Sequence, residues 1–235
     1  MVFTILVFYD HKFVQEQDAN LFCSNTGLGT CFKEYGTGKF EHKDIELYVW
    51  WPKKLGKRVP SLISQGVRDS NSQWGFDIGD DSIAVMWANI GLDPRSASGD
   101  AGHECYLKDT FNRDRLGGKL CVDWKATYQM SKEPVEVAKE YLLRLREEVI
   151  GSLGRLWLKS IVQSIPSTLT ITFPSYWSEE GRNNMIEAVK NSWMQTDERL
   201  NLLRITVITE LEAAAIYSWV DYVSSHKRDA EKVCS

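Results

Sequence analysis

The chain has 235 residues, of which 43% are hydrophobic and 26% are charged, and its formal net charge is -4. This composition is typical of a globular protein with a sizeable core, and it lacks the basic footprint of a nucleic-acid-binding protein. The apolar start, Thr4–Tyr9, is far shorter than the roughly 20 residues of a membrane span and has no positive flank, so we expect neither a membrane anchor nor a signal peptide.

The cysteines and histidines predict a cytoplasmic protein without a metal-ligand cluster. Five cysteines are dispersed and form no C-x-x-C pair, which favours reduced thiols over a disulfide framework. Residues His103–Cys105 read H-E-C, but three consecutive side chains cannot face one ion from regular structure, and no second ligand pair follows. We therefore predict no metal site built from such a motif.

The first half of the chain predicts short strands joined by loops. Strand character is found in Phe3–Asp10, in Asp44–Pro52 and in Arg58–Ser64, whereas Ser82–Ile90 fits either a helix or a strand. Gly91–Gly118 is polar and rich in glycine, which predicts an irregular subdomain insertion with bounds at 84–125. The tryptophans are predicted to fill the core or an interface rather than to stack on bases.

The stretch Ser24–Gly38 holds four glycines and three threonines, which is typical of a turn. Such a turn either cradles phosphate or lies at the surface. A P-loop is not predicted, because Phe40 follows Lys39 where the pattern requires serine or threonine.

The second half begins with a predicted amphipathic helix. Apolar residues recur at spacings of three and four from Val135 to Val149, with Ser131 as the expected N-cap and Gly151 as the expected stop.

A strand, helix, strand, helix order follows. Thr168–Phe173 predicts a strand that Pro174 ends, and Ser178 is expected to cap the next helix. A second strand leads directly into an alanine-rich helix at Glu210. Short links of this kind predict two parallel strands. The polar tail, 224–235, is expected to fray.

Two segments of this half resemble the 70-kDa heat-shock chaperones. Residues 170–189 read TITFPSYWSEEGRNNMIEAV and are similar to the family's V-T-V-P-A-Y-F…R…A segment. Residues 202–219 read LLRITVITELEAAAIYSW and are similar to its L-R-I-I-N-E-P-T-A-A-A-I-A-Y segment, in the same order and at the same separation. The resemblance covers most of 27–219, is weak over 84–125, and points to a divergent branch found in fungi and animals.

This resemblance implies an α/β fold, the actin-like (ribonuclease H-like) ATPase, with ATP and Mg²⁺ held between two lobes. Residues 1–235 would form the first lobe, a mixed sheet with flanking helices. The family's second phosphate turn, D-x-G-G-G-T, does not occur in the sequence. We therefore expect a degenerate or truncated lobe with weak or no ATP hydrolysis. The alternative is a non-catalytic pseudo-enzyme that binds a protein partner, a client or a second copy of itself.

The resemblance also implies a phosphate turn near the N-terminus. The family's turn reads D-L-G-T-T-Y, and the best register places it on Gly27–Phe32, where Gly29 and Thr30 match. Gly27 then stands where the family has an aspartate near magnesium, and Cys31 replaces its second threonine. Backbone N–H groups of such a turn could meet phosphate oxygens.

A second register is also open. It makes Asp10 that aspartate, at the end of the first strand and with a long insertion before the turn. We rank it lower, because a tight strand-to-hairpin loop does not easily accept an insertion.

Three further residues take roles from the resemblance. It implies that Glu210 positions metal-bound water, and that Pro174 and Arg182 couple nucleotide state to a neighbouring domain. Each also has a plain structural interpretation. Glu210 would be an acid stabilised by a helix dipole, Pro174 would end a strand, and Arg182 would be a solvated helix residue.

Overall fold

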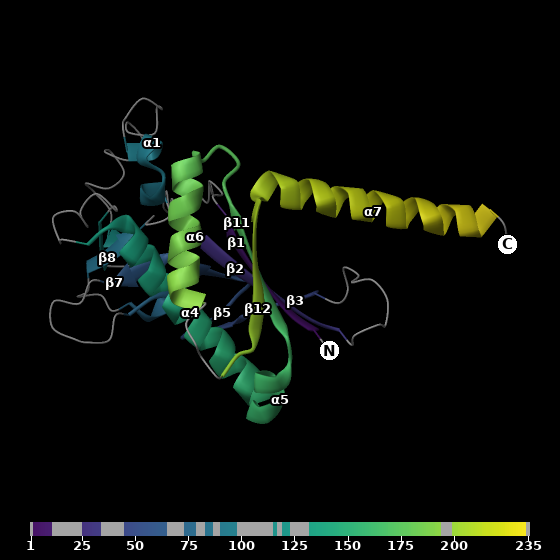
Figure 1. Cartoon of the computed structure of the whole chain (residues 1–235), viewed down its shortest axis with the longest axis horizontal. Helices are drawn as coiled ribbons and strands as arrows, with labels where there is room; N and C mark the ends of the chain where they lie inside the picture. Colours follow the sequence, from purple (N-terminus) through teal and green to yellow (C-terminus); the bar gives the residue numbers. More distant parts are fainter. Residues whose placement is uncertain are drawn as a thin grey trace.

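A six-stranded sheet organises the described part of the chain (Figure 1). The computed structural model describes residues 2–10, 25–33, 45–64, 73–78, 83–86, 90–97, 115–116, 119–122, 132–193 and 199–233. The strands of this main sheet are β1 (Val2–Asp10), β2 (Asn25–Lys33), β3 (Ile45–Leu47), β6 (Arg58–Pro60), β11 (Ser167–Phe173) and β12 (Leu202–Thr209).

The main sheet is mixed in direction. Its order is β12-β11-β1-β2-β3, and β6 pairs with β2 beside β3. β2 runs antiparallel to β1 and β3, whereas β1, β11 and β12 are parallel. The predicted parallel pairing of the two later strands is therefore confirmed, and the connection through a helix is what makes it possible.

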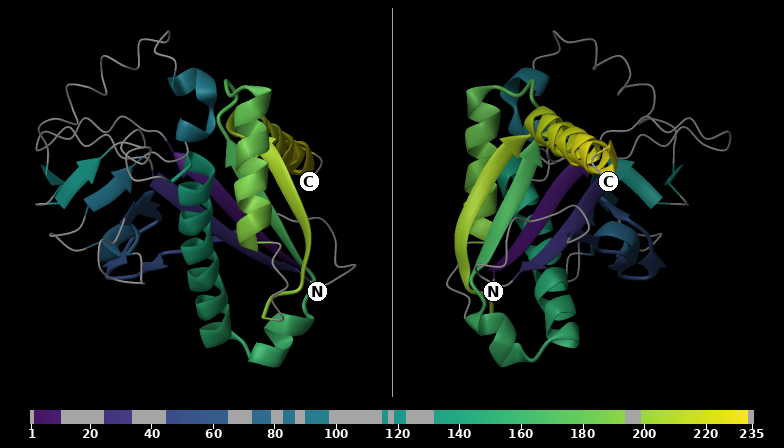
Figure 2. Two further views of the ribbon diagram at one scale, coloured as in Figure 1. Left: turned by 60° about the vertical axis from the view of Figure 1, so that its left-hand side comes forward. Right: turned by 90° about the vertical axis from the view of Figure 1, so that its right-hand side faces the viewer.

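Two helices cover one face of this sheet, α4 (Pro134–Leu156) and α6 (Glu179–Trp193), and the short α5 (Lys159–Ser164) follows α4 (Figure 2). The core lies between these helices and the sheet, because their apolar stripes meet the inward side chains of β11. Fully buried members include Leu142, Leu145, Leu169, Ile171, Met185 and Trp193.

A smaller sheet lies beside the main one. Its strands are β7 (Leu62–Ser64), β8 (Ile83–Met86), β10 (Lys119–Val122) and β9 (Arg115–Leu116), in that order. β4 (Trp50–Trp51) and β5 (Lys54–Leu55) form a hairpin, and the short helices are η2 (Gly75–Asp77), η3 (Ile90–Leu92) and α1 (Pro94–Ala97). The open choice at 82–90 is resolved as a strand at Ile83–Met86, and the subdomain division at 84–125 stays a prediction.

Two predicted helix boundaries are wrong. α4 does not stop at Gly151 but continues to Leu156, because Ser152 and Leu153 beyond the glycine are buried. The polar tail does not fray from residue 224, since α7 (Glu210–Val233) continues through most of it. The expected cap Ser131 lies outside the described residues, and Glu133 is the N-cap of α4.

α7 projects from the sheet on the side opposite α4 and α6 (Figures 1 and 2). It begins immediately after β12 at Glu210. Of the helices that the structure describes, none pairs sufficient length with an apolar stretch suited to crossing a membrane.

Candidate functional site at the carboxyl edge of the main sheet

Three parallel strands end at one edge of the main sheet. Val7 of β1 pairs with Ile171 of β11, which in turn pairs with Val207 of β12. β1 ends three residues later at Asp10, and Glu210 follows the end of β12. Asp10 and Glu210 therefore belong to the same edge, two strands apart, which corresponds to about 10 Å. In open α/β sheets, ligands bind at such carboxyl edges.

A capping box fixes the start of α7 at this edge. The backbone N–H and the hydroxyl of Thr209 both donate to Glu212 Oε2, each at 2.8 Å, and Thr209 Oγ1 accepts from the backbone N–H of Glu212 at 3.0 Å. This reciprocal pair satisfies helix donors that would otherwise be exposed. The backbone and side-chain hydrogen bonds from Thr209 hold the pKa of Glu212 below its ordinary value.

Arg182 brings positive charge to the same region from the first turn of α6. Its guanidinium carbon lies 5.3 Å from the centroid of the Phe173 ring, at the end of β11. The Nε atom is buried and has no hydrogen-bond partner among the described residues. The charge of Arg182 also helps to lower the pKa of Glu212, which places the two side chains within electrostatic reach of each other.

A buried carboxylate, Asp93, holds the loop between β11 and α6. Its Oδ1 accepts from the Ser178 hydroxyl at 2.6 Å, and its Oδ2 accepts from the Ser178 backbone N–H at 3.0 Å. Ser178 in turn accepts from the Gly181 N–H at 3.0 Å, so the predicted cap of this helix is confirmed. Arg95 donates to Asp93 Oδ2 at 3.5 Å and to the Tyr176 carbonyl at 2.6 Å.

The pKa values of Asp93 and Tyr176 at this loop are shifted by burial, hydrogen bonds and neighbouring charges. Burial alone would raise the pKa of Asp93, but the hydrogen bonds from Ser178 and Arg95 outweigh it and the pKa lies below its ordinary value. Partial burial raises the pKa of Tyr176, and the negative charges of Glu210 and Asp93 raise it further. Glu210 and Asp93 thus both lie close enough to Tyr176 to affect its pKa.

The predicted phosphate turn is wrong. Gly27, Gly29, Thr30 and Cys31 lie inside β2, which is an extended strand. Each pairs with a residue of β1 on one side and with a residue of β3 or β6 on the other. Backbone N–H groups committed to ladders on both sides cannot form a phosphate cradle. Composition predicted a turn here because glycine is rare in strands, but pairing with both neighbours overrides that preference.

The second register, which places Asp10 in the family's aspartate position, agrees better with where the strands begin and end. Asp10 ends β1 and pairs with Asn25, the first residue of β2. The intervening segment 11–24, where this register puts the insertion, lies outside the described residues. The insertion therefore falls between strands rather than within one.

The remaining predicted residues lie around the edge. Pro174 directly follows β11, where its missing N–H suits the end of a strand, and it is buried. Arg182 and Glu210 lie on α6 and α7, and both act electrostatically on residues of the edge. The sequence interpretation missed Asp93 and Tyr176, and the Asp93-Pro94 pair, a common helix start, was the available signal.

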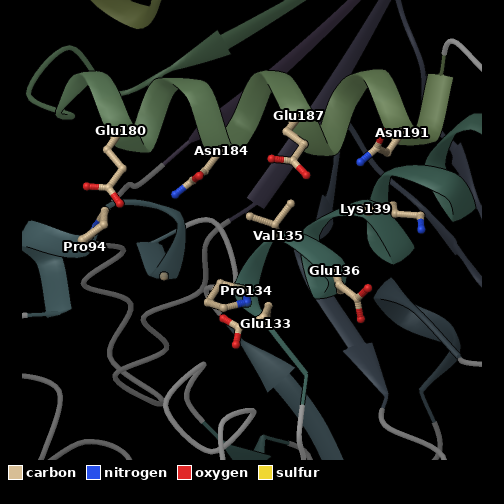
Figure 3. A pocket seen from close by; sticks show the side chains of 11 residues that line it. Pro94, Glu133, Pro134, Val135, Glu136, Lys139, Glu180, Asn184, Glu187 and Asn191 are labelled. Atoms are coloured by element: carbon tan, nitrogen blue, oxygen red, sulfur yellow. The ribbon is translucent and has the colours of Figure 1, made fainter.

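A pocket of about 470 Å³ lies elsewhere, between α4 and α6 (Figure 3). Four carboxylates and one lysine line it, and none of the predicted site residues does: its charged residues are Glu133, Glu136, Lys139, Glu180 and Glu187. Excess negative charge disfavours a phosphate group that is bound without a metal ion.

Comparison with known proteins leaves the family open. No family model and no curated protein matches the sequence.

The described residues include no group of three or more histidine, cysteine, aspartate or glutamate side chains placed to hold a metal ion. What the structure establishes is a mixed α/β arrangement with flanking helices and an edge that gathers Glu210, Arg182 and the end of β1.

Proposed function

We propose that the chain contains a heat-shock-70-like ATPase lobe, which binds magnesium nucleotide at the carboxyl edge and hydrolyses it weakly or not at all. One observation supports this most: Asp10 ends β1, Glu210 directly follows the end of β12, and these two strands belong to the same parallel set. The resemblance assigns carboxylates to these two positions, after the first strand and after the last. The strand pairing favours Asp10 over Gly27 for the first of them.

The chemistry of the edge fits a magnesium nucleotide in part. Mg²⁺ prefers oxygen ligands and binds through one or two carboxylates together with substrate phosphates, so it needs no cage of protein ligands. Asp10 and Glu210 would serve as those carboxylates, directly or through water. Arg182, with its buried Nε, would face the phosphate charge. When bound, the metal would neutralise that charge.

Weak hydrolysis follows from the distribution of charge. Phosphoryl transfer requires positive charge and hydrogen-bond donors around the transferred group. At this edge Arg95 is engaged with Asp93 and the Tyr176 carbonyl, and Arg182 is stacked near Phe173. With the glycine-rich segment held in β2, the described residues of the edge offer few donors to stabilise a transition state.

Calorimetry tests this proposal. We expect the protein to bind ATP with micromolar affinity in Mg²⁺ and at least about tenfold more weakly in EDTA. Asp10→Asn and Glu210→Gln should each weaken the magnesium-dependent binding by about tenfold or more, because each removes one of the two carboxylates proposed to hold the metal. Glu187→Gln, on the opposite side of α6 and in the acidic pocket, is the matched control and should bind like the wild type.

Absence of ATP binding by folded protein would overturn the proposal. So would unchanged affinity in both edge variants, or a weakening by Glu187→Gln equal to theirs. Rapid ATP hydrolysis would be compatible with the proposed nucleotide binding but would contradict the proposal that the lobe hydrolyses ATP weakly or not at all.

The second candidate function is a non-catalytic interaction module. A specific observation favours it: between Leu211 and Tyr222, α7 exposes five large apolar side chains, Leu211, Ile216, Tyr217, Trp219 and Tyr222. Exposed apolar surface of this kind marks interaction sites.

A further inference from the structure

The β4–β5 hairpin exposes two apolar side chains on one of its faces. Trp50 of β4 pairs with Leu55 of β5, and these side chains are 65% and 66% exposed. Residues directly opposite each other in an antiparallel pair lie on the same face. Trp50 and Leu55 therefore form one small apolar surface that is open to solvent.

The other face of the hairpin anchors it to the core. Trp51 is 3% exposed, and its ring meets the rings of Tyr48 and Trp74 edge to face, at centroid distances of 4.6 Å and 6.2 Å. Successive side chains of a strand point to opposite sides, so the fixed position of Trp51 directs Trp50 outward. Core packing thus explains Trp51 but does not explain the exposed Trp50.

Positive charge surrounds this apolar surface. Residues 48–60 contain four basic side chains and no acidic one, although the whole chain has a net charge of -4. Three of the four, Lys53, Lys54 and Lys57, are exposed. Asp77 offsets one charge through its 2.7 Å ion pair with Lys53. The hairpin is therefore locally cationic in an acidic protein.

We propose that this hairpin binds the surface of an anionic lipid bilayer, with Trp50 and Leu55 inserted at the level of the headgroups. Tryptophan is enriched at membrane–water interfaces, because its ring is apolar and its N–H can remain hydrated. Lysines nearby add attraction to anionic lipids over about one Debye length, roughly 10 Å at about 0.1 M salt. Lys57 stays within that range of Leu55, since two residues of extended chain span about 7 Å.

The size and composition of the surface favour a bilayer over a macromolecular partner. Two side chains, even a tryptophan and a leucine, supply far less than the roughly 1,200 Å² that a specific protein interface buries in total. Single-stranded nucleic acid stacks successive bases on aromatic rings, and Leu55 beside Trp50 offers no second ring. A bilayer requires no matching shape, and it accommodates apolar side chains together with the basic charge around them.

Cosedimentation of the whole chain with lipid vesicles tests the proposal. The protein should sediment with vesicles of phosphatidylcholine and phosphatidylserine, and it should stay in the supernatant with phosphatidylcholine alone. Binding should weaken at least about fivefold when salt is raised from about 0.05 M to about 0.5 M, because the Debye length shortens.

Two pairs of variants locate the contact. Trp50→Ala should weaken vesicle binding by about tenfold or more, whereas Trp219→Ala, which removes a tryptophan that is 68% exposed on α7, should not. Lys57→Gln should weaken binding by about fivefold, the effect of one basic charge near an anionic leaflet. Lys190→Gln removes the same charge from an exposed position on α6 and should bind like the wild type. Far-UV circular dichroism checks that each variant is folded.

Fluorescence quenching tests insertion directly. Lipids that carry bromine on the acyl chain quench tryptophans that reach the apolar layer. Trp50→Phe keeps an aromatic ring at this position while removing one of the nine tryptophans. Brominated anionic vesicles should quench the wild type, and Trp50→Phe should lose that quenching.

The inference would be overturned by folded protein that does not bind anionic vesicles, or that binds phosphatidylcholine vesicles equally well. A loss in either control equal to that of its partner variant, or unchanged quenching in Trp50→Phe, would also refute it. Tighter binding to a single-stranded oligonucleotide, abolished by Trp50→Ala, would assign the hairpin to nucleic acid instead. Vesicle binding is independent of ATP binding, so the failure of one leaves the other standing.

Discussion

At the residue scale, Asp93 joins two parts of the chain that are far apart in the sequence. It is 1% exposed and accepts hydrogen bonds from the backbone and side chain of Ser178. A buried carboxylate is stable only when such donors replace its water. Through Ser178, Asp93 stabilises the start of α6 and so helps to position Arg182.

Replacing this carboxylate should reduce stability in a pH-dependent way. We expect Asp93→Asn to lower the free energy of unfolding at pH 7 by roughly 1.5–3 kcal/mol, the usual contribution of hydrogen bonds to a charged group. The native pKa is depressed, so the wild-type advantage is complete above about pH 4 and shrinks as pH falls through the native pKa. Urea titrations at several pH values measure this difference.

Asp77→Asn is the control for that experiment. Asp77 forms a 2.7 Å ion pair with Lys53 at the surface, and such pairs contribute little. A difference between Asp93→Asn and the wild type that stayed constant down to pH 3 would contradict the assigned role.

Tyr48 is a second buried anchor, between the strand region and α4. Its hydroxyl lies 2.5 Å from Glu148 Oε1 and 2.7 Å from both Ser152 Oγ and the Trp50 carbonyl oxygen. Burial, followed by the Glu148 carboxylate, raises its pKa to about 12. We expect Tyr48→Phe to cost roughly 1–2 kcal/mol at pH 7, measured by thermal or urea unfolding.

Measurements at alkaline pH distinguish the contribution of the Tyr48 hydroxyl to stability from the contribution of packing. Because the native pKa is raised, its contribution is complete below pH 10 and is lost as pH rises toward 12. The gap between wild type and Tyr48→Phe should therefore narrow at alkaline pH. A gap that stayed the same would assign the effect to packing.

At the element scale, two glycines in helices have opposite roles. Gly154 of α4 is exposed, and a methyl group added there would meet nothing within 4 Å. Gly181 of α6 touches Asp93, whose Cβ would lie only 2.8 Å from an added Cβ. Gly154 can therefore be replaced by a larger residue, whereas close packing against Asp93 requires glycine at position 181.

This difference predicts stability changes of opposite sign. Gly154→Ala should stabilise the protein by about 0.5–1 kcal/mol, because alanine loses less conformational entropy in a helix. Gly181→Ala should destabilise it by roughly 1–3 kcal/mol through overpacking against Asp93. Differential scanning calorimetry of both variants gives the comparison, and a stable Gly181→Ala would show that the Asp93 contact is loose.

At the scale of the whole molecule, the two faces of the main sheet differ. α4 and α6 bury one face, whereas α7 extends from the other (Figure 2). β11 lies between two strands, and β12 pairs only with β11 among the described strands. Stability should therefore be concentrated around β11 and its covering helices.

Hydrogen exchange should reveal this gradient. Amides of β11 and the buried turns of α4 should exchange most slowly, and those of α7 should exchange fastest in dilute solution. Uniform protection across these elements would contradict the described layering.

The sequence by itself determined the order of elements in the second half. Thr168–Phe173, Pro174 and Ser178 carry strong local signals for a strand, its end and a helix cap, and the short links force parallel pairing. These features depend on backbone chemistry within a few residues of each other. For that reason a single sequence is enough to predict them.

Only the tertiary structure decided the candidate site. It put Gly27 and Gly29 in a strand between two neighbours, carried α4 past Gly151, and brought Asp93 against Ser178. Each outcome depends on contacts between segments distant in sequence, whose free energy outweighs local preference. The edge shared by Asp10 and Glu210 has the same origin, since strand pairing alone brings these residues together.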